Sequence, residues 1–205
     1  MRSIIGICGF QGSGKDTLAE ILINNYGYKK LSFAGAVKDC AAAVFGWNRD
    51  MLEGCTKESR IWREQVDEWW SNRLGIPNLT PRYVLQNFGT ELFRNHFHQD
   101  IWIACIEKQL EKYEKIVITD CRFPNEINMI QNNNGIIIKI FRNEINQLYY
   151  DVKNGQEPTN IHPSEWKWIN SEEDFTIMNN GTIEDLEINI SKLLFHKSII
   201  NRSNC

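Results

Sequence analysis

The sequence predicts a three-layer α/β/α fold built on a central parallel sheet of about five strands. Three observations favour this fold class. Short β-branched apolar runs alternate along the chain with segments whose apolar residues recur at helical spacing. The first of these runs ends in a glycine-rich turn. The length of 205 residues suits one α/β domain with a substantial core, so we expect a single domain over 1–205.

The elements follow in order. Residues 3–8 form a short apolar run that predicts a buried strand. Leu18, Ile21 and Leu22 then fall at helical spacing, which predicts a helix over 15–25. By the same criteria we expect strands at 31–33, 116–119, 135–141 and 175–178, and helices at 36–45, 126–131 and 183–194.

Two long segments separate these elements. Residues 46–113 are largely helical in pattern, and we expect them to form an acceptor-binding insertion. Residues 143–174 are polar and show no clear period. Because such a length is unusual for a simple connection, we expect a mobile, lid-like segment there.

Composition excludes several classes of function. The net charge of -3 argues against a nucleic acid polymer as the main partner, because binding to the phosphate backbone normally requires excess positive charge. No apolar run approaches the length of a membrane span. The six cysteines show neither a CxxC pair nor metal-like spacing, which favours reduced, structural cysteines and a cytoplasmic protein, in the host cytoplasm if it is viral.

The turn after the first predicted strand matches the P-loop pattern. Gly9, Gly14 and Lys15 occupy its fixed positions, between an apolar strand and a helix. Backbone N–H groups that converge on phosphate oxygens require glycine where φ is unusual, and the start of a helix adds its positive dipole end. We therefore expect ATP to bind here, with Lys15 on the β- and γ-phosphates. The predicted contacts are Gln11, Gly12, Ser13, Gly14, Lys15, Asp16 and Thr17.

Asp16 stands where the usual motif has serine or threonine. A carboxylate beside polyphosphate is repulsive without a cation, so Asp16 indicates a Mg²⁺-dependent site. Thr17, one position later, contacts either the metal or a phosphate. A purely structural role for Asp16 stays open, because the helix dipole favours an acid in the first turn.

Asp120 ends a second apolar strand, as a Walker B acid does, and Arg122 follows it. The carboxyl ends of parallel strands lie beside the ligand, so Asp120 is a candidate for Mg²⁺ and Arg122 for phosphate. Alone, the pair could be a surface turn. Together with the P-loop, Lys15, Asp120 and Arg122 are our candidate catalytic residues.

Six segments carry a resemblance to a known family; they lie at 14–17, 33–39, 85–91, 100–103, 120–122 and 179–186. The most telling pair is Gly-Thr-Glu at 89–91 followed by Asp-x-Trp at 100–102. Over most of its length the chain resembles the deoxynucleoside monophosphate kinases of T4-type bacteriophages and large DNA viruses. The resemblance implies transfer of the ATP γ-phosphate to a deoxynucleoside monophosphate (dNMP), small-molecule nucleotide partners and a P-loop kinase fold. A homodimer is compatible with it.

The matching positions that the resemblance implies are Lys15, Asp16, Thr17, Lys38, Gly89, Thr90, Trp102 and Arg122. Trp102 either stacks on the base or is a core residue of an amphipathic helix. Arg82 and Arg94 flank the Gly89–Thr90 pair and could hold the acceptor phosphate. Arg142, at the end of the fourth expected strand, is a candidate cation of the lid-like segment.

Phosphoryl transfer between two anions requires positioning and charge neutralisation more than a general base, so we assign no base. Kinases for another phosphorylated acceptor, of the phosphomevalonate or dephospho-CoA type, remain the nearest alternatives. A nucleotide-binding switch is a more distant one, because residues 141–144 lack the guanine signature that a GTPase would carry.

Overall fold

The five strands of the computed structural model form a single parallel sheet; the structure describes residues 2–203, and the side chains of residues 2–195. The strands are β1 (Ser3–Cys8), β2 (Lys29–Leu31), β3 (Lys115–Ile118), β4 (Ile136–Phe141) and β5 (Phe175–Met178). Their order is β2-β3-β1-β4-β5. Every pairing is parallel, with Ile5 of β1 opposite Val117 of β3 and Ile136 of β4. The predicted α/β class and the five-stranded parallel sheet are confirmed.

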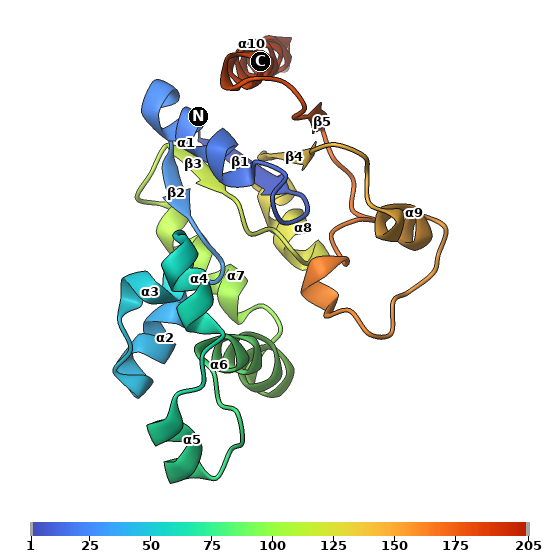
Figure 1. Cartoon of the computed structure of the whole chain (residues 1–205). Helices are drawn as coiled ribbons and strands as arrows, with labels where there is room; N and C mark the ends of the chain where they lie inside the picture. Colours follow the sequence, from blue (N-terminus) through green and yellow to red (C-terminus); the bar gives the residue numbers. More distant parts are fainter. Residues whose placement is uncertain (1, 204–205) are drawn as a thin grey trace. The chain divides into compact units, whose positions relative to one another are not determined.

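The chain divides into two compact units, which are described separately. The first combines Met1–Ser32 with Gln109–Cys205 and contains the sheet. Its helices are α1 (Lys15–Tyr26), α8 (Pro124–Asn132), α9 (Gln147–Lys153) and α10 (Ile183–Ser203), with a short 3-10 helix at Pro163–Glu165 (Figure 1).

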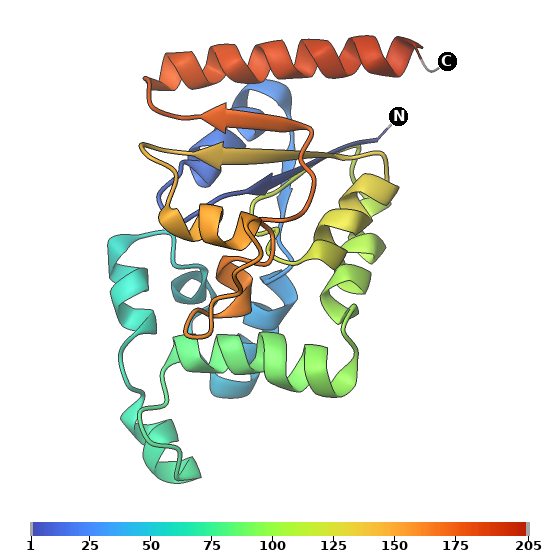
Figure 2. The same cartoon turned by 90° about the vertical axis from the view of Figure 1, so that its right-hand side faces the viewer.

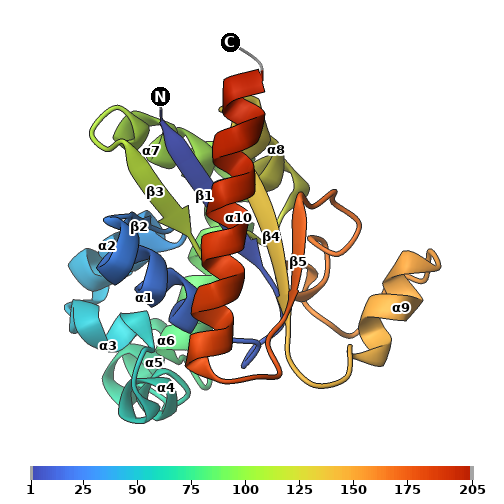
Figure 3. The same ribbon diagram turned by 90° about the horizontal axis from the view of Figure 1, so that it is seen from above.

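Helices cover both faces of this sheet. On one face, α1 and α10 pack over the strands through an apolar core, and Figure 3 shows α10 lying along the sheet. On the other face, α8 approaches so closely that a Cβ on Gly6 would lie 2.7 Å from Ile130 of this helix. Figure 2 shows β4 and β5 side by side beneath α10. Because both faces are covered, β1 is buried almost throughout, as the unbroken apolar run predicts.

The second unit, Phe33–Lys108, is helical. It contains α2 (Gly35–Phe45), α3 (Arg49–Glu53), α4 (Lys57–Arg63), α5 (Glu68–Leu74), α6 (Pro81–Gln86), the π-helix η1 (Asn87–Phe97) and most of α7 (Ile101–Leu110). Much of its interior is aromatic: Phe45 stacks on Trp47 at 4.4 Å, and Trp47 Nε1 donates to Asp67 Oδ2 at 2.8 Å. This unit includes most of the predicted insertion but begins earlier, at Phe33. That the chain acts as a single domain stays a prediction.

Two predicted elements differ from the structure. The second strand lies at Lys29–Leu31 rather than 31–33. The prediction missed it because Lys29 and Lys30 are exposed on this edge strand, so the sequence shows no apolar run there. The segment 143–174, predicted without regular structure, contains α9, whose N-terminus is capped by the Asn146 side chain. Across residues 2–203, no helix is both long enough and apolar enough to cross a membrane.

Candidate active site

The phosphate-binding loop joins β1 to α1 and is shaped by its glycines. Gly14 has φ +100°, in the left-handed region, and α1 begins at the next residue. Within the loop, the Ser13 N–H donates to Phe10 O at 3.3 Å. Ser13 itself is 4% exposed, and its Oγ has no hydrogen-bond partner among the described residues. A buried hydroxyl of this kind fits a loop that receives an oxygen-rich ligand such as a phosphate chain.

Lys15 closes the loop on itself. Its Nζ donates to Gly9 O at 2.7 Å and to Phe10 O at 2.6 Å. Burial lowers the pKa of Lys15, and the positive charge of Arg122 lowers it further, while Asp16 and Glu165 oppose the change. Lys15 and Arg122, the two cations predicted to bind phosphate, therefore interact electrostatically within the first unit. Placing two positive charges together is unfavourable unless an anion joins them.

Asn179, at the carboxyl end of β5, holds the loop from the side. Its Nδ2 donates to Ser13 O at 3.0 Å, and its own N–H donates to Phe141 O at 2.7 Å. The contact is close: a Cβ on Gly14 would lie 2.2 Å from Asn179 Nδ2. The Asn179 amide therefore fixes the carbonyl of Ser13 in the loop.

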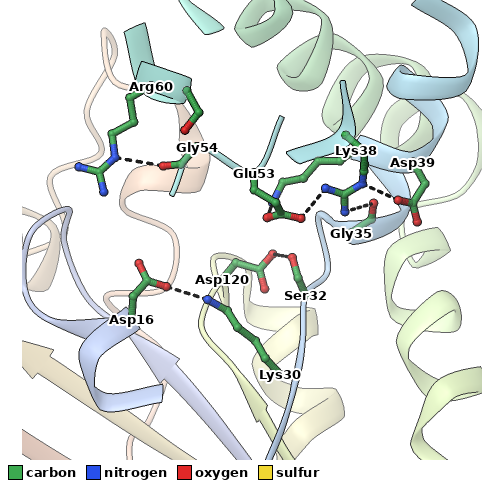
Figure 4. Close-up of polar contacts among 12 residues, drawn as sticks. Asp16, Lys30, Ser32, Gly35, Lys38, Asp39, Glu53, Gly54, Arg60 and Asp120 are labelled. Carbon is green, nitrogen blue, oxygen red and sulfur yellow. Dashed lines mark hydrogen bonds and ion pairs between the residues drawn. The ribbon is translucent and has the colours of Figure 1, made fainter. Parts of the chain in front are cut away.

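The two candidate metal acids have different surroundings. The Asp16 side chain is 73% exposed and pairs with Lys30, whose Nζ lies 2.9 Å from Asp16 Oδ1. Asp120 follows β3 and is half-buried; its Oδ2 accepts from Ser32 Oγ at 2.7 Å. Figure 4 shows both contacts. Thr17 is half-buried in the first turn of α1.

The side chains of Asp16, Thr17 and Asp120 suit a Mg²⁺ ion that is bound together with ATP. Within the part of the chain that the structure describes, no group of three or more His, Cys, Asp or Glu side chains could hold a metal ion by itself. Mg²⁺ bound to ATP takes only one or two protein oxygens, since phosphates and water supply the rest. Asp16, Thr17 and Asp120 offer hard oxygen donors of the type it prefers.

Arg122 is held by the segment predicted to be a lid. Its Nη1 donates to Glu165 Oε1 at 3.0 Å and to Ser164 Oγ at 3.3 Å. The backbone of this turn is fixed by Glu126, which is 1% exposed and accepts from the N–H groups of Arg122 at 2.7 Å and Phe123 at 3.1 Å. The guanidinium of Arg122, which was predicted to bind phosphate, is therefore paired with the Glu165 carboxylate in this structure.

The lid-like segment is anchored at its second half. Lys139 of β4 is fully buried, and its Nζ donates to Ile169 O at 2.8 Å, Ser171 O at 2.6 Å and Glu173 Oε2 at 2.7 Å. Trp168 packs edge-on against Phe10 of the phosphate-binding loop, with ring centroids 5.1 Å apart. Trp166, Trp168 and Ile169 therefore belong to the core of the first unit, whereas other side chains of this stretch, such as Lys167, are exposed. Arg142, the predicted lid cation, is exposed just after β4.

The remaining predicted residues belong to the helical unit. Trp102 is 3% exposed and its Nε1 donates to Gly89 O at 2.8 Å, so the structure favours the core alternative over base stacking. Gly89 and Thr90 lie in the π-helix η1, and Arg94 is half-buried in the same helix. Helices of this rare type are frequent at functional sites. Trp102 fixes the backbone of this helix.

Lys38 and Glu53 form the centre of a charged network in the same unit. Lys38 Nζ lies 2.6 Å from Glu53 Oε2, and Arg49 bonds both Glu53 and Asp39 (Figure 4). Burial raises the pKa of Glu53, but the hydrogen bonds and charges of Lys38 and then Arg49 outweigh it, so the net shift is downward. Lys38 is therefore tied to a carboxylate in this structure. Arg82, the last of the predicted acceptor contacts, pairs with Glu64 at 3.2 Å.

Comparison with known proteins assigns the chain to a family. A model of the family described as deoxynucleotide monophosphate kinase matches residues 59–190, more than half of the chain. The chain belongs to this family. The resemblance predicted from sequence segments and the predicted enzyme class, a kinase that uses ATP and acts on nucleotides, are confirmed.

Similar proteins occur in viruses. A protein of Acanthamoeba polyphaga mimivirus is 28% identical, covering 97% of this chain and 99% of its own. The deoxynucleoside-5'-monophosphate kinase of Escherichia phage T5 is also 28% identical, over 80% of this chain and 84% of its own. The deoxynucleotide monophosphate kinase of Enterobacteria phage T4 is 22% identical, over 93% of this chain and 98% of its own.

Two solved kinases have a similar but distant arrangement. Dephospho-CoA kinase from Campylobacter jejuni is 17% identical, covering 94% of this chain and 96% of its own, with a TM-score of 0.46. Shikimate kinase from Aquifex aeolicus is 14% identical, covering 96% and 98%, also with a TM-score of 0.46. The fold itself rests on the strand order described above.

Sequence reasoning missed three residues that shape the candidate site. Asn179 donates a hydrogen bond to the phosphate-binding loop, Glu126 accepts hydrogen bonds from the turn after β3, and Glu165 pairs with Arg122. A signal existed for Asn179, which follows the last predicted strand and therefore lies at the carboxyl edge of the sheet. Glu126 follows Arg122 closely, but its burial could not be read from the local pattern.

Proposed function

We propose that this kinase transfers the γ-phosphate of ATP to the phosphate of a dNMP, giving the diphosphate and ADP, with Mg²⁺ as its metal. The observation that carries the proposal is the loop between β1 and α1, where Gly14 precedes the helix and the Lys15 ammonium lies on the loop carbonyls of Gly9 and Phe10. The positive charge of Arg122 helps to lower the pKa of Lys15, so a bound polyphosphate, which interacts favourably with both cations, suits this loop.

Each residue has a proposed role. Lys15 leaves the loop carbonyls and neutralises the β- and γ-phosphates, which offer it a full negative charge in place of two dipoles. Arg122 leaves Glu165 and binds the phosphate in transfer. Gln11, Gly12, Ser13 and Gly14 supply backbone N–H groups, and Asp16, Thr17 or Asp120 hold Mg²⁺. When bound, Mg²⁺ supplies positive charge to the phosphate oxygens.

The acceptor is held by the helical unit. We assign Lys38, Arg82 and Arg94 to it as cations, with Gly89 and Thr90 as backbone and hydroxyl contacts. Residues 143–174, including Arg142, exclude water so that ATP is not simply hydrolysed. No general base is required, since the acceptor is an anion and positioning supplies most of the rate.

A coupled ADP-release assay tests this function. The panel contains the common dNMPs, the ribonucleotides, phosphomevalonate and dephospho-CoA. We expect at least one dNMP to stimulate ADP formation well above the rate with ATP alone, and phosphomevalonate and dephospho-CoA, which are not nucleoside monophosphates, to leave it at background. If no dNMP stimulates ADP formation, the proposal fails. The assembly into a homodimer stays a prediction that sedimentation equilibrium tests.

A further inference from the structure

The turn Pro163–Glu165, in the segment that connects α9 to β5, lies close to the phosphate-binding loop (Figure 1). Trp168 joins the two: its Nε1 donates to Glu165 O at 3.0 Å, and its ring packs edge-on against Phe10, with ring centroids 5.1 Å apart. Phe10 O in turn accepts from Lys15 Nζ at 2.6 Å. The backbone of Glu165 is therefore connected through one side chain to the loop that is proposed to bind ATP.

The side chains of this turn are directed to Arg122. Arg122 Nη1 donates to Glu165 Oε1 at 3.0 Å and to Ser164 Oγ at 3.3 Å. Ser164 is held in turn by His162, whose Nδ1 lies 2.8 Å from Ser164 Oγ and accepts from the Ser164 N–H at 3.3 Å. The contact to Arg122 thus involves an ordered turn and not the Glu165 side chain alone.

The negative charge of Glu165 also reaches Lys15. Burial is the largest cause of the lowered pKa of Lys15 and the charge of Arg122 the next, while Asp16 and then Glu165 oppose them. Glu165 therefore interacts favourably with both cations that are assigned to the phosphates. A polyphosphate that binds the same two cations meets the charge of Glu165 as a repulsion, so the carboxylate and the ligand compete for one place.

The Arg122–Glu165 pair is weak enough to be replaced. Its two side chains are 50% and 43% exposed, and exposed ion pairs contribute little because water screens them. The guanidinium presents the same planar fork of donors to phosphate as to carboxylate. By contrast, the pair of Lys139 with Glu173 contains a fully buried cation, so the second half of the segment stays anchored when the first half is released.

We propose that Glu165 is an autoinhibitory counter-ion: its carboxylate neutralises Arg122 in the empty enzyme, and the terminal phosphate of ATP displaces it and releases the turn Pro163–Glu165. The inference rests on the proposed function, from which it takes ATP as the ligand and Arg122 as the residue that binds the transferred phosphate. Displacement of Glu165 couples the occupancy of the phosphate site to the lid-like segment, so that this segment responds to ATP.

The test is isothermal titration with Mg²⁺ and a non-hydrolysable ATP analogue. It compares the wild type with Glu165→Gln and with the matched control Glu157→Gln, since Glu157 is an exposed glutamate of the same segment. We expect Glu165→Gln to bind the analogue about two- to fivefold more tightly, the range that an exposed ion pair contributes. Glu157→Gln makes the same change in net charge and should alter the Kd by less than about 1.5-fold at about 0.15 M salt.

Two comparisons show whether Glu165 acts through Arg122. ADP lacks the terminal phosphate and should leave the Arg122–Glu165 pair intact, so its Kd should change by less than about 1.5-fold in Glu165→Gln. In an Arg122→Gln background no pair remains to be broken, and adding Glu165→Gln should improve binding of the ATP analogue much less than it does in the wild type. The ADP comparison decides alone if Arg122→Gln does not fold.

Hydrogen exchange tests the release of the turn. The N–H groups of Glu165 and Trp166 donate to His162 O at 2.9 Å and to Pro163 O at 3.2 Å. Both should exchange faster in the empty Glu165→Gln variant than in the empty wild type, because the contact to Arg122 no longer holds the turn. The Ile169 N–H, which belongs to the anchored half, should exchange at an unchanged rate.

An unchanged or raised Kd of Glu165→Gln for the ATP analogue overturns the inference. Equal gains for the analogue and ADP, or with and without Arg122, also overturn it, because Glu165 would then not compete with the terminal phosphate. Unchanged exchange at Glu165 and Trp166 would contradict the release of the turn. These measurements require no acceptor, so a wild type that binds ATP but phosphorylates no dNMP ends the proposed function, while the binding data still decide the role of Glu165.

Discussion

Replacing Gly14 by alanine tests how the phosphate-binding loop is held. A β-carbon at this position meets two obstacles. The φ of +100° lies in the left-handed region, which costs an L-residue about 1–2 kcal/mol. The same atom would lie 2.2 Å from Asn179 Nδ2, so Asn179 must move and give up its hydrogen bond to Ser13 O, worth about 0.5–1.5 kcal/mol.

Together these terms amount to about 1.5–3.5 kcal/mol, which corresponds to a loss of ATP affinity of roughly 10- to 400-fold if binding requires the native loop. Isothermal titration with ATP and Mg²⁺ measures it. Gly12→Ala is the matched control, because Gly12 also has a positive φ, +81°, but an added Cβ meets nothing within 4 Å. It should lose only the part due to strain, roughly 5- to 30-fold.

The double variant Gly14→Ala/Asn179→Ala separates the two terms. Without the Asn179 amide the clash is gone, so adding Gly14→Ala to Asn179→Ala should cost only what Gly12→Ala costs. Equal effects of Gly14→Ala with and without Asn179 would refute the reasoning that this amide braces the loop.

Three further predictions concern charged residues. Lys15→Ala should lower kcat by about 10²–10³-fold in the coupled assay, as removal of one strong charge stabiliser does, and near-normal turnover would end its assignment. Lys139→Met should lower the free energy of unfolding in urea by about 3–5 kcal/mol, because it leaves the Glu173 carboxylate without its cation. Adding Glu173→Gln should restore part of this loss. A loss below about 1 kcal/mol would contradict the conclusion that Lys139 anchors the second half of the lid-like segment. The pKa of Glu53 in the folded protein is lowered below its ordinary 4.5, so on acidification the unfolded chain binds the proton before the folded chain does. The stabilisation that Glu53 contributes is therefore complete above pH 4.5 and is lost as the pH falls through the pKa of the folded state. Acid should therefore destabilise the wild type more than Glu53→Gln in denaturant titrations at about pH 5 and pH 3, and equal pH dependence would contradict the Lys38–Glu53 pairing.

The part of the site that the sequence predicts is the part built from consecutive residues. The strand at residues 3–8, the loop and the helix from Lys15 depend on a local apolar run, on glycine and on helical spacing, and each is found where expected. The edge strand β2 is misplaced because Lys29 and Lys30 face solvent and give no apolar pattern.

Partners distant in sequence could not be predicted in this way. Asn179 and Ser13 are 166 positions apart, and Arg122 and Glu165 are 43 apart. Their pairing depends on the order in which parallel strands assemble, which no local pattern contains. Trp102 shows the same limit: its spacing fits a core position and a base-stacking position equally, and only its burial favours the core.

The central claim, transfer of the terminal phosphate of ATP to a nucleotide, is tested most directly by following the label of γ-³²P-ATP. The reaction contains enzyme, Mg²⁺ and the dNMP that stimulates ADP release, and its products are separated by thin-layer chromatography. We predict that the label appears in the deoxynucleoside diphosphate in proportion to the ADP formed, and that Lys15→Ala abolishes most of it. Label found only in inorganic phosphate would contradict the account, because ADP would then arise from hydrolysis.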